Sequence, residues 1–203
     1  MMKRIKASVL AMAFFGLAAG LGGSARASTW EMDMSHSQIG FSVRHMMVSN
    51  TSGRFAKATG TLELDDKDLA RSNVSIAIET ASVDTQDQKR DEHLRSPDFF
   101  ATAEHPQMTF KSKSVKAKGK GYVVSGDLTI RGVTRPVVLE VAELTGPVKD
   151  PWGNERRGAT ATAKINRKDF GMVWNRTLDT GGLVVGDEVL IKLDIECIKA
   201  KQQ

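Results

Sequence analysis

The segment Val189-Leu190-Ile191-Lys192-Leu193-Asp194-Ile195-Glu196-Cys197 is typical of a β-strand that is buried on one face. Every second side chain is apolar: Val189, Ile191, Leu193, Ile195 and Cys197. The residues between them are mainly charged, so the two faces of an extended chain would differ in polarity. The same alternation predicts that Cys197, the one cysteine of the chain, is a small buried hydrophobic residue rather than a reactive thiol.

This alternation recurs along most of the chain after Ser28. Further examples lie at 38–44, 61–65, 74–79, 108–110, 128–130 and 137–141. Strands with one apolar and one polar face belong to antiparallel sheets that are wetted on one side. Glycines at turn-like spacing punctuate the second half. Eight or nine such strands in about 170 residues predict an all-β closed barrel or sandwich.

One polar stretch, from Ser82 to Pro106, breaks the pattern. Its composition predicts a short helix from Gln88 to Arg95 that ends before Pro97, followed by a turn that holds Phe99 and Phe100. A long insertion between strands, here around residues 86–100, is usually functional and often forms a lid or a plug.

The segment from Gly158 to Ile165 places Ala159, Ala161 and Ala163 at alternate positions. If these positions face inward, the strand offers small side chains where other strands offer Phe, Leu and Ile. An eight-stranded barrel is near the largest size that side chains alone can fill, so such a row favours a ligand cavity. The alternative is that bulky residues opposite, such as Phe41 or Phe110, fill the space.

The first 27 residues have the order of a secretory signal peptide. They begin with Lys3, Arg4 and Lys6, continue with an apolar stretch at 7–23, and end in Ala25-Arg26-Ala27. That stretch is short for the alternative, a membrane anchor. We expect cleavage after Ala27, which leaves one exported domain at residues 28–203.

Cleavage also removes most of the basic excess. The chain carries a formal charge of +5, and the loss of four basic residues lowers it to +1. A nearly neutral protein offers no electrostatic reason to bind nucleic acid. A single cysteine excludes an internal disulfide framework.

Motifs for catalysis are absent from the sequence. The four histidines, His36, His45, His93 and His105, are scattered and have no metal-site spacing. The chain has no Gly-x-Ser-x-Gly motif and no dinucleotide-binding glycine motif that precedes a helical pattern. We therefore expect no enzymatic activity, no metal centre and no cofactor.

Several blocks of the sequence resemble the YceI-like family of bacterial periplasmic proteins. They are HSQIGFSVRH at 36–45, GRF at 53–55, KRDEHLRSPDFF at 89–100, HP at 105–106, MTF at 108–110, GDLTIRGVT at 126–134, INRKDFGM at 165–172 and GDEV at 186–189. The blocks follow the family's order and extend over nearly all of Ser28 to Lys199.

The resemblance implies an extended antiparallel barrel of eight strands, similar to lipocalins, in the periplasm. It also implies an interior tunnel that holds an isoprenoid-type lipid, such as a polyprenyl diphosphate or a quinone tail, without established catalysis. A carrier of this kind is compatible with transient contact with a membrane. It is also compatible with a homodimeric state.

The expected ligand-binding residues are the inward side chains of the strands, of the insertion and of the segment before the last strand. They are Phe41, Val43, His45, Phe55, Ile76, Ile78, Phe99, Phe100, Met108, Phe110, Leu128, Ile130, Ala161, Ala163, Ile165, Phe170, Met172 and Trp174. We expect Met172 and Trp174 to close one end of the tunnel.

A polar lipid head group has six candidate partners: His36, Arg44, His45, Arg90, His93 and Arg167. Alternation places Arg44 outside if Phe41 and Val43 are inside, which favours His45. Arg90, Asp91 and His93 are either ligand contacts or a structural clamp for the insertion, and we favour the clamp.

Two other functional classes compete with the carrier. One is an enzyme or redox accessory that acts on a tunnel-bound quinone or lipid, and it requires a titratable group that faces the tunnel. The other is a packed barrel without ligand that serves protein contacts, and it requires Phe41 and Phe110 to fill the interior.

Overall fold

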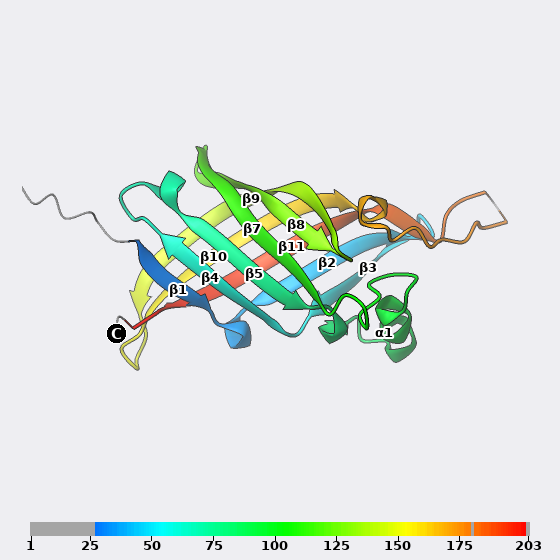
Figure 1. The fold of residues 1–203 in the computed structure, drawn as a ribbon, viewed down its shortest axis with the longest axis horizontal. Helices are drawn as coiled ribbons and strands as arrows, with labels where there is room; N and C mark the ends of the chain where they lie inside the picture. Colours follow the sequence, from blue (N-terminus) through cyan, green and yellow to red (C-terminus); the bar gives the residue numbers. More distant parts are fainter. Residues whose placement is uncertain (1–26, 180, 202–203) are drawn as a thin grey trace, which may run out of the picture.

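The computed structural model describes residues 27–179 and 181–201, which form one continuous antiparallel sheet and a single α-helix (Figure 1). The predicted signal peptide, residues 1–27, lies outside the described residues apart from Ala27. Within the described ranges, no helix is long and apolar enough to cross a membrane.

The sheet contains eleven strand segments. They are β1 (Ser28–Met32), β2 (Gln38–His45), β3 (Ser49–Phe55), β4 (Ala58–Leu64), β5 (Asn73–Glu79), β6 (Val83–Asp84), β7 (Gln107–Lys118), β8 (Gly121–Ile130), β9 (Val133–Lys149), β10 (Glu155–Asn166) and β11 (Val185–Lys199). The helix α1 is Gln88–Arg95, and four short 3₁₀ helices are η1 (Met34–His36), η2 (Leu69–Arg71), η3 (Thr80–Ser82) and η4 (Arg167–Phe170).

Six of the segments combine into three bent strands. β1 and β2 both pair with β11, β4 and β3 pair with β1 and β2 respectively, and β5 and β6 pair with β4 and β3. When each bent strand is counted once, eight antiparallel strands form a closed barrel, which confirms the predicted fold class. Two of the bends are joined, because Ala56 N–H donates to Ser82 O at 3.0 Å.

The alternation in β11 produces the barrel wall as predicted. Ile195 and Cys197 are buried, and their charged neighbours point away from the core. Inside the half of the barrel near the chain termini, apolar side chains pack around Trp30, which is only 1% exposed. Burial raises the pKa of the Cys197 thiol to about 11, so at neutral pH Cys197 is a protonated core residue.

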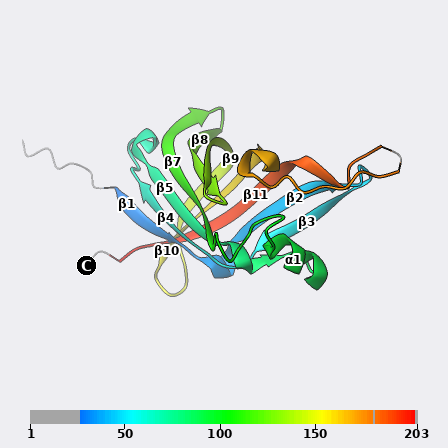
Figure 2. The ribbon, with the colours of Figure 1, turned by 45° about the vertical axis from the view of Figure 1, so that its right-hand side comes forward.

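The insertion folds where the sequence places it. Helix α1 occupies Gln88–Arg95, as predicted, and Asp87 caps it by accepting a hydrogen bond from Arg90 N–H at 3.0 Å. A turn then carries Phe99 and Phe100 back to the barrel. Figure 2 shows α1 beside β3, at the end of the barrel away from the termini.

Arg156 joins three carboxylates where β1, β10 and β11 meet. Its guanidinium donates to Asp33 at 2.9 Å, to Asp150 at 2.8 Å and to Glu196 at 2.5 Å. Hydrogen bonds from Ser35, His36 and Arg156 hold the pKa of Asp33 well below its usual value, and those from Arg156 and Asn154 do so for Asp150. The network thus ties the first strand to the last two.

We predict that Arg156→Met lowers the thermal unfolding midpoint at pH 7 by on the order of 5 °C, because three carboxylates lose a shared cation. The folded-state pKa of Asp150 lies below its ordinary value of 3.8, so its stabilising effect is full above that pH and is lost as the pH falls. The difference between Arg156→Met and the wild type should therefore narrow below pH 3.8.

Scanning calorimetry between pH 2 and 8 measures this effect, and Lys164→Met is the matched control. Lys164 forms an exposed ion pair with Glu188 at 2.9 Å, which we expect to contribute little. Equal shifts in the two variants, or a difference that does not depend on pH, would contradict the prediction.

Candidate functional site

A cavity of about 300 Å³ occupies the half of the barrel that faces α1. A single water needs only about 10–15 Å³ on the same measure, so this space is no packing defect. Phe41 and Phe110 line the cavity and do not fill it, which argues against the packed, ligand-free barrel. The volume is near the lower limit of small-molecule pockets, roughly 300–1,000 Å³.

Fifteen of the eighteen predicted ligand-binding residues lie on the cavity walls. They are Phe41, Val43, His45, Phe55, Ile76, Ile78, Phe99, Phe100, Met108, Phe110, Leu128, Ile130, Ile165, Met172 and Trp174. The structure therefore brings together residues from six strand segments, the insertion and the segment before β11. That these side chains contact a lipid stays a prediction.

Ala161, Ala163 and Phe170 are buried but do not line the cavity, so their assignment to its walls was wrong. Ala161 pairs with Leu193 on one neighbouring strand and Val141 on the other, and its methyl group is too short to reach past such side chains. Phe170 is 1% exposed because η4 packs it into the core. The alanine row therefore does not create the cavity.

Several wall residues were missed by the sequence prediction. They are Ile39, Val137, Leu139, Val189, Ile191 and Leu193 on strands, and Thr85, Leu94, Val184 and Val185 outside strand centres. The strand residues continue the same apolar alternation, so the signal was available. The others depend on how the insertion and the loop before β11 fold back, which no local pattern encodes.

The β2–β3 hairpin carries a gradient of polarity along its inner face. Cross-strand partners change from Ile39 and Phe55, through Phe41 and Gly53 and then Val43 and Thr51, to His45 and Ser49 at the tip. Apolar groups thus lie deep in the barrel and hydrogen-bonding groups lie near the surface. An amphiphile with its polar end outward matches this order.

The cavity reaches the surface where the exposed side chains of Arg44 and Arg90 stand among its lining residues. Arg44 is exposed, as alternation predicted, and its Nη2 donates to Met47 O at 2.7 Å, yet it also borders this mouth. His36 does not: it lies on η1 and pairs with Asp33 at 2.9 Å. His36 is therefore excluded as a head-group partner at this cavity.

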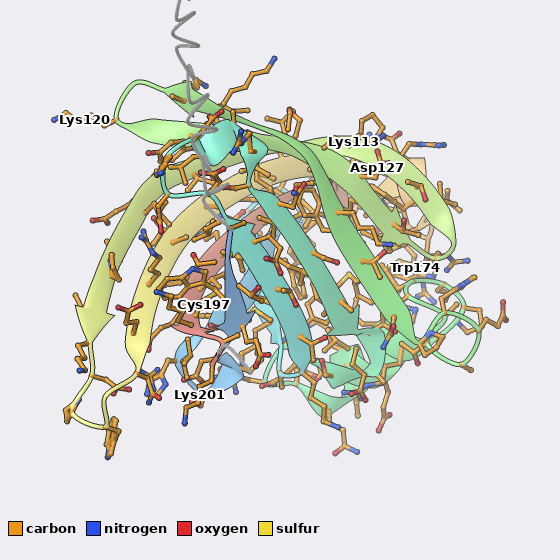
Figure 3. The ribbon with its side chains drawn as sticks, turned by 60° about the vertical axis from the view of Figure 1, so that its left-hand side comes forward. Lys113, Lys120, Asp127, Trp174, Cys197 and Lys201 are labelled. Atoms are coloured by element: carbon orange, nitrogen blue, oxygen red, sulfur yellow. The ribbon has the colours of Figure 1, made fainter. Side chains whose placement is uncertain are left out.

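Three aromatic rings stand together beside the mouth. The ring centroids of His93 and Trp174 are 4.8 Å apart, those of His93 and Phe99 are 4.9 Å apart, and both pairs are edge-to-face. His93 Nε2 also contacts Asp98 Oδ2 at 2.9 Å. Figure 3 shows Trp174 far from Cys197, at the other end of the barrel. This cluster joins the insertion to the segment before β11.

Arg90 and Asp91 form the clamp that the sequence favoured. Asp91 is buried and accepts hydrogen bonds from Thr85 N–H at 2.9 Å and Thr85 Oγ1 at 2.6 Å. Arg90 donates from Nε to Thr85 Oγ1 at 2.8 Å and from Nη2 to Thr85 O at 2.9 Å. These contacts fix α1 to the end of β6.

Arg167 performs a similar role on the other side of the mouth. Its side chain is 3% exposed, and its donors bond to Gly186 O, Met172 O, Trp174 O, Val185 O and Asp187 Oδ1. Burial lowers the pKa of Arg167 from its ordinary value. Because all five N–H groups have partners, this guanidinium has no donor left for a phosphate.

Asp33, His36 and Glu196 place ligand atoms within 4.8 Å of one another, the spacing of a metal site. Arg156 already donates to both carboxylates, so a cation is present in the middle of this cluster. The geometry fits an ion-pair network better than a divalent metal.

Both the sequence and the fold of this chain are similar to those of known proteins. The YceI-like domain model matches residues 30–197. Protein YceI of Escherichia coli O17:K52:H18 is 43% identical over 199 residues, which cover 97% of this chain and 100% of that protein.

Two solved structures share the fold. Burkholderia cenocepacia BcnA matches with a TM-score of 0.68 and 27% identity, over 81% of this chain and 98% of that chain. A polyisoprenoid binding domain from Saccharophagus degradans, implicated in plant cell wall breakdown, matches with a TM-score of 0.61 over 86% of this chain and 99% of that chain. The latter is 16% identical, so it shows the fold alone.

Gly53 provides the space that the Phe41 ring occupies at the cavity wall. A Cβ at Gly53 would lie 2.4 Å from Phe41 Cζ and 2.7 Å from Thr85 Cγ2. We predict that Gly53→Ala destabilises the fold by about 1–3 kcal/mol, because both neighbours must move. Gly40→Ala is the matched control, since a Cβ at Gly40 would lie an ordinary 3.4 Å from its nearest neighbour, Lys192 O. Urea unfolding measures both variants, and equal losses of stability would contradict the assignment.

The Thr85 hydroxyl is the centre of the clamp. We predict that Thr85→Val costs about 1–3 kcal/mol, because Asp91 and Arg90 each lose a buried partner. The loss should appear as faster amide hydrogen exchange than in the wild type, and the increase should be larger in α1 than in β8. Thr134→Val, which removes an exposed hydroxyl pair with Thr129, should leave exchange in α1 unchanged. Uniformly faster exchange over the barrel would show that the hydroxyl does not act locally.

Proposed function

The chain belongs to the YceI-like domain family, and we propose that it is a periplasmic binding protein that carries an isoprenoid-type amphiphilic lipid in its barrel. The signal-peptide pattern at residues 1–27 supports export. The name of the Saccharophagus degradans domain, a polyisoprenoid binding domain of the same fold, supports the class of ligand.

The observation that carries the proposal is the cavity and its walls. Most of its lining side chains are apolar, and they come from the strands, the insertion and the segment before β11. Each methylene removed from water contributes about 0.8 kcal/mol, so a tail of several isoprene units binds without any polar contact. Apolar walls of this kind select for an extended hydrocarbon.

The polar end of the lipid would lie at the mouth. His45 and Thr51 face inward near the hairpin tip, and Arg44 stands at the rim. Arg90 already donates to Thr85, and Arg167 already donates to Met172 O and Trp174 O in the loop before β11. The head group, a quinone or a diphosphate, would therefore contact His45, Thr51 and Arg44, with the tail inside.

This arrangement supports binding better than catalysis. The buried carboxylate next to the cavity, Asp91, is held by Thr85, and His93 is held by Asp98 and two aromatic rings. These groups fix the walls instead of converging on a bound lipid. An enzyme or redox accessory would have to depend on His45.

Mass spectrometry of organic extracts from protein purified without detergent tests the proposal. We predict that the wild type yields an isoprenoid-type lipid and that Val137→Trp, which fills the cavity, yields roughly tenfold less. Val138→Trp is the matched control, because Val138 is the next residue of β9 and is 50% exposed. Both variants should fold.

A ligand-free wild type in several gentle preparations would overturn the carrier function. Equal lipid in Val137→Trp and Val138→Trp would remove the cavity as its site. If His45→Ala retains the lipid but abolishes a cellular phenotype, the enzyme or redox accessory replaces the carrier.

A further inference from the structure

Five exposed apolar residues gather next to the cavity mouth, and we call them the mouth lip. Three form the tip of the β2–β3 hairpin, and two lie in the loop before β11: Met46, Met47, Val48, Val173 and Leu183. Their exposed fractions range from 37% for Leu183 to 76% for Val48. Figures 1 and 2 show both segments side by side at the end of the molecule opposite the termini.

The mouth lip is joined directly to the cavity wall. Met46 N–H donates to Val184 O at 2.8 Å, and His45 pairs with Val185. His45, Val184 and Val185 all line the cavity. Val184 and Val185 therefore connect the apolar wall of the cavity to the hairpin tip, beside the polar side chain of His45.

The hairpin tip is an ordered turn, not a loose end. Met46 and Met47 have φ angles of 47° and 61°, in the left-handed region where glycine and asparagine are favoured. Val48 N–H donates to His45 O at 3.0 Å, and Arg44 Nη2 donates to Met47 O at 2.7 Å. The chain thus places two large apolar side chains in solvent at positions where they are conformationally unfavourable.

The charges around the mouth lip suit a phosphate-bearing surface. On the two segments that carry the lip, residues 43–51 and the described part of 171–185, the charged side chains are Arg44, Arg176 and Asp179. Asp98 of the insertion lies beside the same mouth, where it contacts His93. Arg44 and Arg176 are exposed and flank the apolar residues, and guanidinium groups bind phosphate oxygens. Methionine, valine and leucine side chains enter the acyl boundary of a bilayer, while arginines bind the lipid head groups.

We propose that the mouth lip docks the barrel on an anionic lipid bilayer, so that an isoprenoid tail passes between the membrane and the cavity without crossing water. This inference rests on the proposed carrier function. A second copy of the chain fits less well, because stable protein interfaces use roughly 20–30 residues a side. Five apolar residues on two narrow segments are too few, whereas shallow insertion into a bilayer needs no complementary surface.

Flotation with phosphatidylcholine vesicles that contain phosphatidylglycerol tests the docking. The variant Met47→Glu/Val48→Glu should reduce the vesicle-bound fraction roughly tenfold. The two new carboxylates are repelled by the anionic phosphates, and the apolar contacts of Met47 and Val48 are lost. Vesicles of phosphatidylcholine alone should bind the wild type more weakly. Trp152→Glu is the matched control: Trp152 is 80% exposed on the β9–β10 turn, and this variant should float like the wild type.

Two further readouts separate this inference from the carrier function. Geranylgeraniol added from solution should bind equally to the wild type and to Met47→Glu/Val48→Glu. When geranylgeraniol is delivered from vesicles, the variant should take it up more slowly than the wild type. If the wild type binds geranylgeraniol but does not float, or if the lip variant floats equally, the docking is refuted and the carrier function stands. If neither protein binds geranylgeraniol but the wild type floats, the carrier function fails and the membrane surface remains.

Light scattering measures the oligomeric state and so separates membrane docking from a contact between two copies of the chain. A wild-type dimer that Met47→Glu/Val48→Glu converts to a monomer would show that the mouth lip is a contact between copies of the chain, and it would overturn the docking. The lip residues are exposed, so the variant should retain the wild-type unfolding midpoint. If the variant unfolds earlier, the single change Val48→Glu, at the most exposed lip position, repeats the comparison.

Discussion

Strand β11 is the element on which closure of the barrel depends. It pairs with β10 over residues 188–198 and, on its other edge, with β1 near one end and with β2 near the other. Backbone hydrogen bonds to both halves of the bent first strand leave β11 no free edge inside the barrel wall. The bends at η1, at residues 56–57 and at η3 let one half close around Trp30 while the other half stays wide enough for a cavity.

Arginines hold the wide half together without making its interior polar. Arg90 and Arg95 donate to backbone carbonyls of residues 81–85, from η3 to the segment before α1, and Arg131 donates to carbonyls of the insertion. Arg167 donates to Met172 O and Trp174 O in the loop before β11. Their charged groups satisfy carbonyls that irregular segments leave without strand partners. The aliphatic and aromatic side chains are thereby free to face inward, and the same guanidiniums give the mouth its rigid frame.

The sequence predicts the strands and the helix well because each depends on local physics. Alternation identifies β2, β8 and β11, and Asp87 and Pro97 bracket a helix that the structure places at Gln88–Arg95. Prediction from the sequence fails where contacts with neighbouring segments decide which residues line the cavity. Ala161 and Ala163 face the interior, but longer side chains on adjacent strands separate them from the cavity. Likewise, Val184 and Thr85 join the walls only because distant segments pack beside the mouth, and no spacing in the chain specifies that.

A small void of about 10 Å³ beside Trp30 is lined by different residues from the cavity, and we infer that the packed half around Trp30 makes the cavity blind. A guest in such a space enters and leaves by the same path, so loading and unloading are the forward and reverse directions of a single process. A second molecule cannot displace the first from behind. Under the proposed carrier function, occupancy would therefore be governed by how strongly each encountered membrane or partner retains the lipid, and net movement would follow that difference without any internal gate.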